Sequence, residues 1–158
     1  MSQQKTQAVK KAETFDKAQL ILFGVVPTLD GIAEMLARRD DNSTGGDDLA
    51  ASILHYGAEV LMAVLADEPM PEAPELLLSL KLEDKIEGEI FRPLFSANAR
   101  MWLGFASGQL KRNGELLIRL DPNTEGKDDK TGRALLFVRR MVLALLGEGE
   151  MPDMAKPI

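Results

Sequence analysis

The fold class of this chain depends on one stretch, residues 109–120, which has the sequence QLKRNGELLIRL. Its centre, Asn113-Gly114, is the residue pair that a two-residue turn between β-strands prefers, because both turn positions need positive φ angles. Gly114 could equally end a helix, since glycine is common just past a helix C-terminus. The stretch therefore leaves two alternatives open: a mostly α fold, or an α+β fold with a small antiparallel sheet around 109–121.

Outward from this stretch, the chain favours helices. An apolar run, residues 20–26, ends at Pro27 and is too short for its periodicity to distinguish a helix from a buried strand. Beyond it, Thr28 is placed to cap a helix over residues 29–39, and the acidic pair 47–48 is placed to cap a second helix over residues 49–65. We therefore expect a mostly α fold, a helical hairpin plus further packed helices.

The distribution of polar residues predicts how the chain is organised. Residues 1–12 are polar and lack a period, and residues 147–158 mix glycine, proline and acidic residues, so we expect a disordered arm and a disordered tail. Between them we expect a single globular domain, residues 13–146, with a possible internal boundary at residues 68–74, marked by Pro71 and Pro74. Residues 121–132 are polar and predict a loop.

Composition indicates a globular protein, with 45% apolar and 28% charged residues. The first residues lack the pattern of a secretory signal. No apolar run is close to the length of about 20 residues that a helix needs to cross a membrane. Cysteine is absent, as is usual in a reducing compartment. We therefore expect a cytoplasmic protein with no membrane partner.

Side chains suited to catalysis are scarce. The chain has no cysteine and one histidine, His55, whose neighbour Glu59 would complete only part of a zinc site. Residues 40–51 and 121–132 resemble the first half of a calcium-binding loop, but Ala51 and Gly132 stand where that loop needs a glutamate. We therefore expect no enzyme activity, no catalytic residues, no metal and no cofactor.

Apolar helical surface indicates binding instead. Residues 134–146 are apolar except at two arginines, which predicts either the central core helix or a helix that meets a second chain. We expect a non-enzymatic protein–protein interaction module: a small acidic adaptor, chaperone-like or inhibitory protein that binds a partner protein or forms a homodimer. The expected partner-binding residues are Leu136, Arg139, Arg140, Val142, Leu143 and Leu146.

A basic stretch supports an alternative function. The chain has a net charge of −6, yet residues 92–146 hold ten basic and five acidic side chains. Four rings, Phe91, Phe95, Trp102 and Phe105, would share one helical face, and we expect the core to bury them. Rings beside a basic track can instead stack on single-stranded nucleic acid. The alternative is a small nucleic-acid-binding regulator using residues 92–140, through Arg92, Arg100, Trp102, Lys111, Arg112 and Arg119.

Overall fold

The computed structural model describes residues 17–38, 46–74, 97–120 and 126–152. Within these ranges the chain forms α2 (Lys17–Arg38), α3 (Gly46–Ala66), α6 (Ala97–Leu120) and α7 (Lys127–Leu145). These residues contain no β-strand, so the prediction of a mostly α fold is confirmed and the alternative with a sheet around 109–121 is not supported.

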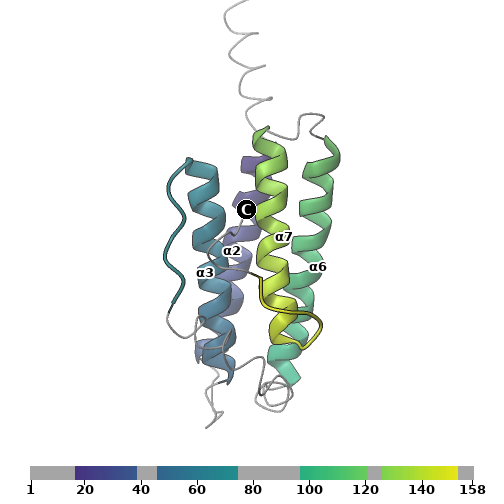
Figure 1. The fold of residues 1–158 in the computed structure, drawn as a ribbon. Coiled ribbons are helices and arrows are strands. Elements are labelled where there is room, and N and C mark those ends of the chain that lie inside the picture. The colour runs from purple at the N-terminus through teal and green to yellow at the C-terminus, as the bar shows by residue number, and fades with distance from the viewer. Residues whose placement is uncertain (1–16, 39–45, 75–96, 121–125, 153–158) are drawn as a thin grey trace, which may run out of the picture.

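The helices form a bundle of two antiparallel hairpins, α2 with α3 and α6 with α7 (Figure 1). Contacts between α3 and α7 join the hairpins on one side, whereas α2 and α6 touch much less on the other side. One end of the bundle holds the start of α2 and the C-terminal ends of α3 and α6 (Figure 1). The bundle is therefore well packed between α3 and α7 and more open between α2 and α6.

The core runs along the bundle axis, and α7 contributes a large share of it. Most apolar side chains of α7 between Ala134 and Leu145 are buried, and its Val138 approaches Gly57 of α3. Of the two roles predicted for residues 134–146, the structure therefore shows that of a core helix. The largest fully buried side chains among the described residues are Phe137, Leu22, Leu29, Ile53, Leu54, Leu61, Leu103, Leu110, Leu117, Leu135 and Met141.

The Asn113-Gly114 pair lies inside α6, so both predicted roles, a strand turn and a helix end, are wrong. Asn113 stays helical, and its side-chain Nδ2 donates to the carbonyl of Gln109 at 2.9 Å. Gly114 is buried where α6 meets α7, and a Cβ there would lie 3.0 Å from the carbonyl oxygen of Gly132. The glycine therefore serves close helix packing, which propensity at the level of single residues does not reveal.

Pro27 does not separate two elements, because α2 continues through it. The predicted capping role of Thr28 is therefore wrong: its Oγ1 donates to the Gly24 carbonyl at 2.7 Å, inside the helix. Proline costs the helix one backbone hydrogen bond, but the apolar face of α2 packs on the core both before and after Pro27. Tertiary packing thus outweighs the local break.

The predicted loop 121–132 is shorter than expected, since α7 begins at Lys127. Acidic residues in the first turn of α7, Asp128 and Asp129, favour a helix N-terminus, and Asp129 pairs with Arg133 at 2.9 Å. Residues 121–125, the predicted arm 1–12 and residues 153–158 of the predicted tail lie outside the described residues.

Two non-helical segments pack against the bundle. Residues 67–74 follow α3 back along its outer side (Figure 1), and the Tyr56 hydroxyl donates to the carbonyl of Pro71 at 3.4 Å. Gly147, with φ of 76°, ends α7, after which Met151 packs against the core. Met151 and Pro152 of the predicted tail therefore lie against the bundle, whereas residues 147–150 are exposed. The predicted boundary at 68–74 contacts the first hairpin.

Two described helices, α2 and residues 49–66 of α3, are long and apolar enough to cross a membrane by length and composition. This corrects the expectation that no apolar stretch approaches that length: the charged residues of α2 are confined to its ends and its last third, which leaves a long apolar window. Core helices of soluble proteins pass the same test, and 61% of the α3 window is buried in the bundle, against 39% of the α2 window. The helix with unused apolar surface is therefore α2.

Candidate interaction surface

The outward face of α2 is apolar where a bundle exposed to water would normally be charged. Residues 18–29 contain no charged side chain, and the chain makes three helical turns over this stretch. Leu20 is 70% exposed and Phe23 is 55% exposed. A surface helix normally carries polar residues opposite its core face, so this side of α2 lacks the usual solvent-facing chemistry.

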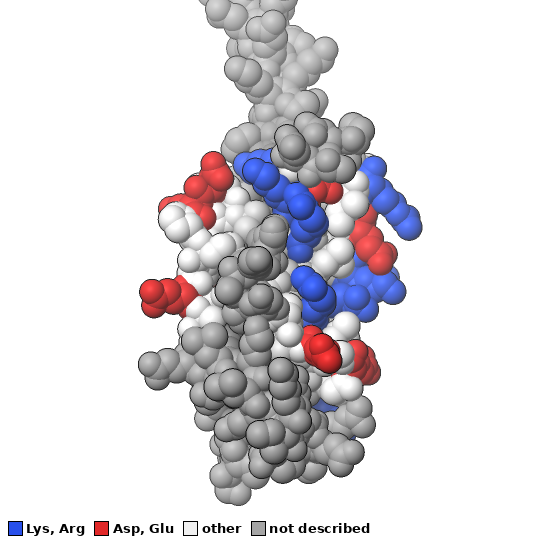
Figure 2. Space-filling model, viewed as in Figure 1, with Lys and Arg blue, Asp and Glu red and all other residues white. Residues whose placement is uncertain are grey.

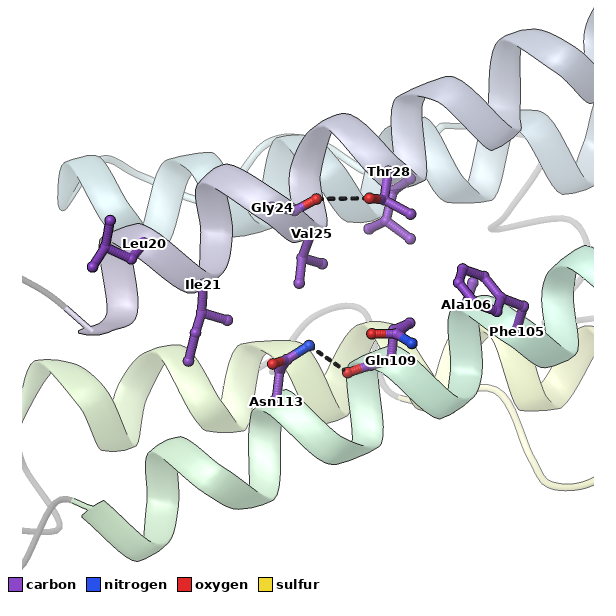
Figure 3. Close-up of a pocket in the computed structure, with 10 residues that line it drawn as sticks. Leu20, Ile21, Gly24, Val25, Thr28, Phe105, Ala106, Gln109 and Asn113 are labelled. Carbon is purple, nitrogen blue, oxygen red and sulfur yellow. Dashed lines mark hydrogen bonds between the residues drawn. The ribbon is translucent and has the colours of Figure 1, made fainter.

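A cleft of about 400 Å³ lies beside this face, between α2 and α6 (Figure 3). Three polar residues line it, Thr28, Gln109 and Asn113, and two of them, Thr28 and Asn113, use their side-chain hydrogen-bond donors on carbonyls of their own helices. The remaining wall is mainly apolar, which suits an apolar side chain better than a polar ligand. The cleft is lined by Leu20, Ile21, Gly24, Val25, Thr28, Leu29, Phe105, Ala106, Gln109 and Asn113.

Exposed apolar side chains of α3 and α6 extend this face on both sides of α2. On α3, Met62 is 42% exposed, and the Asp30–His55 pair, with 2.9 Å between Oδ1 and Nδ1, sets a register that places Met62 at the level of Phe23. On α6, Phe105 and Leu116 are 47% and 44% exposed. We call these residues together the α2 surface: Leu20, Phe23, Met62, Phe105 and Leu116.

The predicted burial of the aromatic face is wrong for one ring. Trp102 is partly buried and meets Phe105 edge to face, with ring centroids 5.9 Å apart, but Phe105 remains half exposed at the cleft. Along this part of α6 the buried side chains include Leu103, Ala106 and Leu110, and Phe105 instead lines the cleft towards α2. Phe91 and Phe95 lie outside the described residues.

Charge divides the molecule between its two hairpins. The described residues 17–74 hold two basic and eight acidic side chains, whereas α6 and α7 hold nine basic and three acidic ones. Figure 2 shows Lys and Arg gathered over α7 and α6, while the charged side chains over α3 are acidic. On α6, Lys111, Arg112 and Arg119 border a shallow hollow together with Glu115 and Leu116. A basic track therefore adjoins the α2 surface.

Most of the predicted partner-binding residues lie inside the bundle. Val142 is fully buried, Leu136 packs against Gly114, and Leu143 and Leu146 are half-buried, so α7 offers little free apolar surface. Arg140 is exposed, whereas Arg139 is half-buried and its Nε has no hydrogen-bond partner among the described residues. The sequence indicates that residues 134–146 form an apolar helix, but it does not show which helix of the bundle remains exposed.

The predicted nucleic-acid residues are more accessible. Arg100, Lys111, Arg112 and Arg119 are all exposed on α6, and Trp102 is partly buried beside them in sequence. Arg92 lies outside the described residues. These four cations share a helix with Phe105, whose ring is half exposed.

Titratable groups do not assemble into a reactive centre in the described part of the chain. No group of three or more His, Asp or Glu side chains there could hold a metal ion. His55 is half exposed and pairs with Asp30, which links α2 to α3. Burial, with a smaller effect of the nearby Glu59 carboxylate, raises the pKa of Tyr56 above its ordinary value, and among the described residues the hydroxyl bonds to the Pro71 carbonyl.

Comparisons with known proteins add no family: no family model, curated protein or solved structure matches the chain. The α2 surface was missed in the sequence because residues 20–26 alone do not reveal a helix, although the absence of charge across residues 18–29 was visible. Only the bundle shows that half of this apolar stretch points away from the core.

Proposed function

We propose that the chain is a non-enzymatic, cytoplasmic protein–protein interaction module, an adaptor, chaperone-like or inhibitory protein that binds a polypeptide on its α2 surface. The observation that supports the proposal is the uncharged face of α2, with Leu20 and Phe23 more than half exposed beside an apolar cleft. Covering either side chain would gain roughly 1–2 kcal/mol, at about 25 cal/mol per Å² of apolar area. A continuous exposed apolar face of this kind marks interaction sites.

The shape of the surface favours a helix as the bound element. The cleft lies between two antiparallel helices and extends from Leu20 to Leu29 on α2, about 14 Å at 1.5 Å per residue. That length accommodates two to three turns of an amphipathic helix, which would present apolar residues at three- and four-residue spacing. For α2 to cross a membrane, the α2 residues that pack on the core would have to leave the core.

The proposal is tested by photo-crosslinking in the cells that make the protein. A benzophenone side chain at position 23 is expected to capture a polypeptide, whereas the same group at position 101 is not, because Met101 is 59% exposed but lies outside the α2 surface. A second variant, Leu20→Ser with Phe23→Ser, should abolish binding of the captured polypeptide to the purified protein while Met101→Ser retains it. Equal crosslinking at both positions, or none at position 23, would contradict the proposal.

One observation favours a second candidate function, the binding of nucleic acid by α6. Arg100, Lys111, Arg112 and Arg119 are all exposed along that helix. If they contact phosphates, log affinity for single-stranded DNA should fall with log salt by about 0.7 per phosphate contact. The Arg112→Gln, Arg119→Gln variant should lower that slope by about two contacts. An affinity that salt does not change would exclude this function.

A further inference from the structure

We infer that the polypeptide on the α2 surface is a second copy of this chain, in a parallel two-fold dimer. In this dimer the two α2 helices meet at the axis, and α6 of each copy lies against α3 of the other. The inference rests on the proposed function, because it names the occupant of the same surface. Three features of the bundle support it: the charges on its two flanks, the residues along the outer face of α2, and the area available.

The first feature is the opposite charge of the two flanks of α2. On the α6 flank, Arg112 and Arg119 lie one turn before and after the exposed Leu116. On the α3 flank, Glu59 lies one turn before the exposed Met62, and Glu68 follows the end of α3. All four charged side chains are exposed.

Their heights along the bundle also match. The Asp30–His55 pair places Glu59 near the middle of α2 and Glu68 near its start. Across the cleft, Figure 3 shows Asn113 opposite the stretch between Ile21 and Val25, and Phe105 beyond Thr28. Arg112 therefore lies near the middle of α2, and Arg119, two turns further along α6, lies near its start, the same two levels as Glu59 and Glu68. The α2 surface therefore has a basic flank and an acidic flank in register, with an apolar strip between them.

Symmetry then selects the orientation of the second copy. A two-fold axis parallel to the helices places the basic flank of each copy on the acidic flank of the other, so that Arg112 faces Glu59 and Arg119 faces Glu68, twice per dimer. A two-fold axis perpendicular to the helices would place α6 on α6, with arginine against arginine. Charge complementarity thus favours the parallel dimer, and no unrelated partner is needed to supply the matching charges.

The second feature is the outer face of α2, which suits a helix–helix seam. Leu20, Phe23, Pro27 and Gly31 recur at spacings of three and four residues, as a seam between two helices requires. Open space surrounds the positions where Gly24 and Gly31 would carry a Cβ, so a second helix can approach closely there. The seam ends at Glu34, whose carboxylate pairs with Arg38 on the same helix.

The third feature is area. A face two helices wide over residues 17–34 of α2 measures about 20 by 26 Å, which corresponds to about 1,000 Å² buried by two copies, the area that a specific interface should reach.

The absence of cysteine allows a direct test with single spin labels. We expect sedimentation equilibrium to show a dimer at micromolar concentration. A nitroxide on Gly24→Cys should give an inter-copy distance within about 20 Å, since two contacting helices are each about 10–12 Å across. The matched control is Gly108→Cys, where an added Cβ also meets nothing, and its label on α6 should give a much longer distance.

A charge-swap experiment tests the parallel orientation. Arg112→Glu with Arg119→Glu, and separately Glu59→Lys with Glu68→Lys, should each weaken self-association about tenfold or more, because like charges then face each other. Mixing the two variants should restore dimers, as each flank regains an opposite partner. Unchanged self-association of both variants would indicate the antiparallel dimer, in which like charges already face each other in the wild type, and would overturn the inference.

Other outcomes separate this inference from the proposed function. A monomer at all concentrations, with position 23 crosslinked to another polypeptide, overturns the second copy and leaves the interaction module. A crosslink from position 23 to residues 75–96 of the same chain overturns both. A dimer whose Gly108 labels are closer than its Gly24 labels also overturns the inference, because its interface would then lie on the outer face of α6.

Discussion

At the scale of single residues, glycine pairs decide how closely the helices pack. A Cβ on Gly132 would lie 2.7 Å from the Gly114 carbonyl oxygen, a backbone atom that cannot move aside without shifting α6. The conformational freedom of these glycines is therefore secondary to their lack of a side chain. The same residue type elsewhere in the bundle has no such role, since a Cβ on Gly108 would meet nothing within 4 Å.

We predict that Gly132→Ala lowers the free energy of unfolding by about 1–3 kcal/mol, the typical cost of overpacking a tight contact. Gly108→Ala, its helical control, should raise that free energy by about 0.5–1 kcal/mol, because alanine is the better helix former. Urea denaturation followed by circular dichroism measures both. Equal effects of the two substitutions would show that the α6–α7 contact is looser than the structure indicates.

A second prediction at this scale concerns alkaline pH. Because burial raises the pKa of Tyr56 in the folded protein, the protonated hydroxyl is favoured by folding. The contribution of the protonated hydroxyl to the free energy of unfolding is fully present below the unfolded pKa of about 10. It is lost as pH rises through the higher folded pKa. Stability should therefore fall less steeply above about pH 10 in Tyr56→Phe than in the wild type. Parallel curves for the two proteins would contradict this.

At the scale of elements, α2 shows how packing can override a local signal. Pro27 breaks the hydrogen-bond ladder of α2, yet Val25 and Leu29 on either side are both buried in the core. The proline ring itself is exposed, so it meets no core side chain. The helix is thus continuous, but Pro27 has no N–H to donate to the carbonyl of Phe23, one turn before it.

We predict that Pro27→Ala stabilises the protein by about 1–3 kcal/mol, because the amide of residue 27 can then bond the Phe23 carbonyl. Thr28→Ala is the control: it removes an exposed bond to the Gly24 carbonyl and should change stability by less than about 0.5 kcal/mol. Thermal unfolding of the monomer, at protein concentrations below dimer formation, measures both. Destabilisation by Pro27→Ala would mean that the proline restricts the unfolded chain more than it weakens the helix.

At the scale of the whole molecule, the two hairpins carry opposite charge. The acidic hairpin packs beside the basic one through α3 and α7, so electrostatic attraction between them adds to the apolar core. The net charge of −6 conceals this division, because the described hairpins are nearly balanced against each other.

We predict that sodium chloride lowers the free energy of unfolding of the monomer as its concentration rises from about 0.02 to 0.5 M, since screening shortens the Debye length from about 20 to 4 Å. Arg112→Gln with Arg119→Gln should make this dependence shallower. An unfolding free energy that is constant over this range, or that rises, would show that the attraction between hairpins contributes nothing.

The sequence by itself determined the class of the fold. Three- and four-residue apolar periodicity over residues 29–39 and 49–65 predicts helices, and the apolar run 134–146 predicts another. Each of these ranges overlaps a helix of the bundle. Periodicity is a property of neighbouring residues, which is why the sequence alone reveals it. The apolar run also identified residues 134–146 as a candidate core helix.

Tertiary structure alone decided the ends of the elements and the exposed surface. Asn113-Gly114 and Pro27 have strong local preferences for turns and breaks, but each lies within a helix because long-range packing outweighs a preference of a few kcal/mol. The exposure of Leu20 and Phe23, and the burial of Val142, depend on which helices become neighbours. Which helices become neighbours is decided by the packing of the whole bundle, and no stretch of local sequence contains that information.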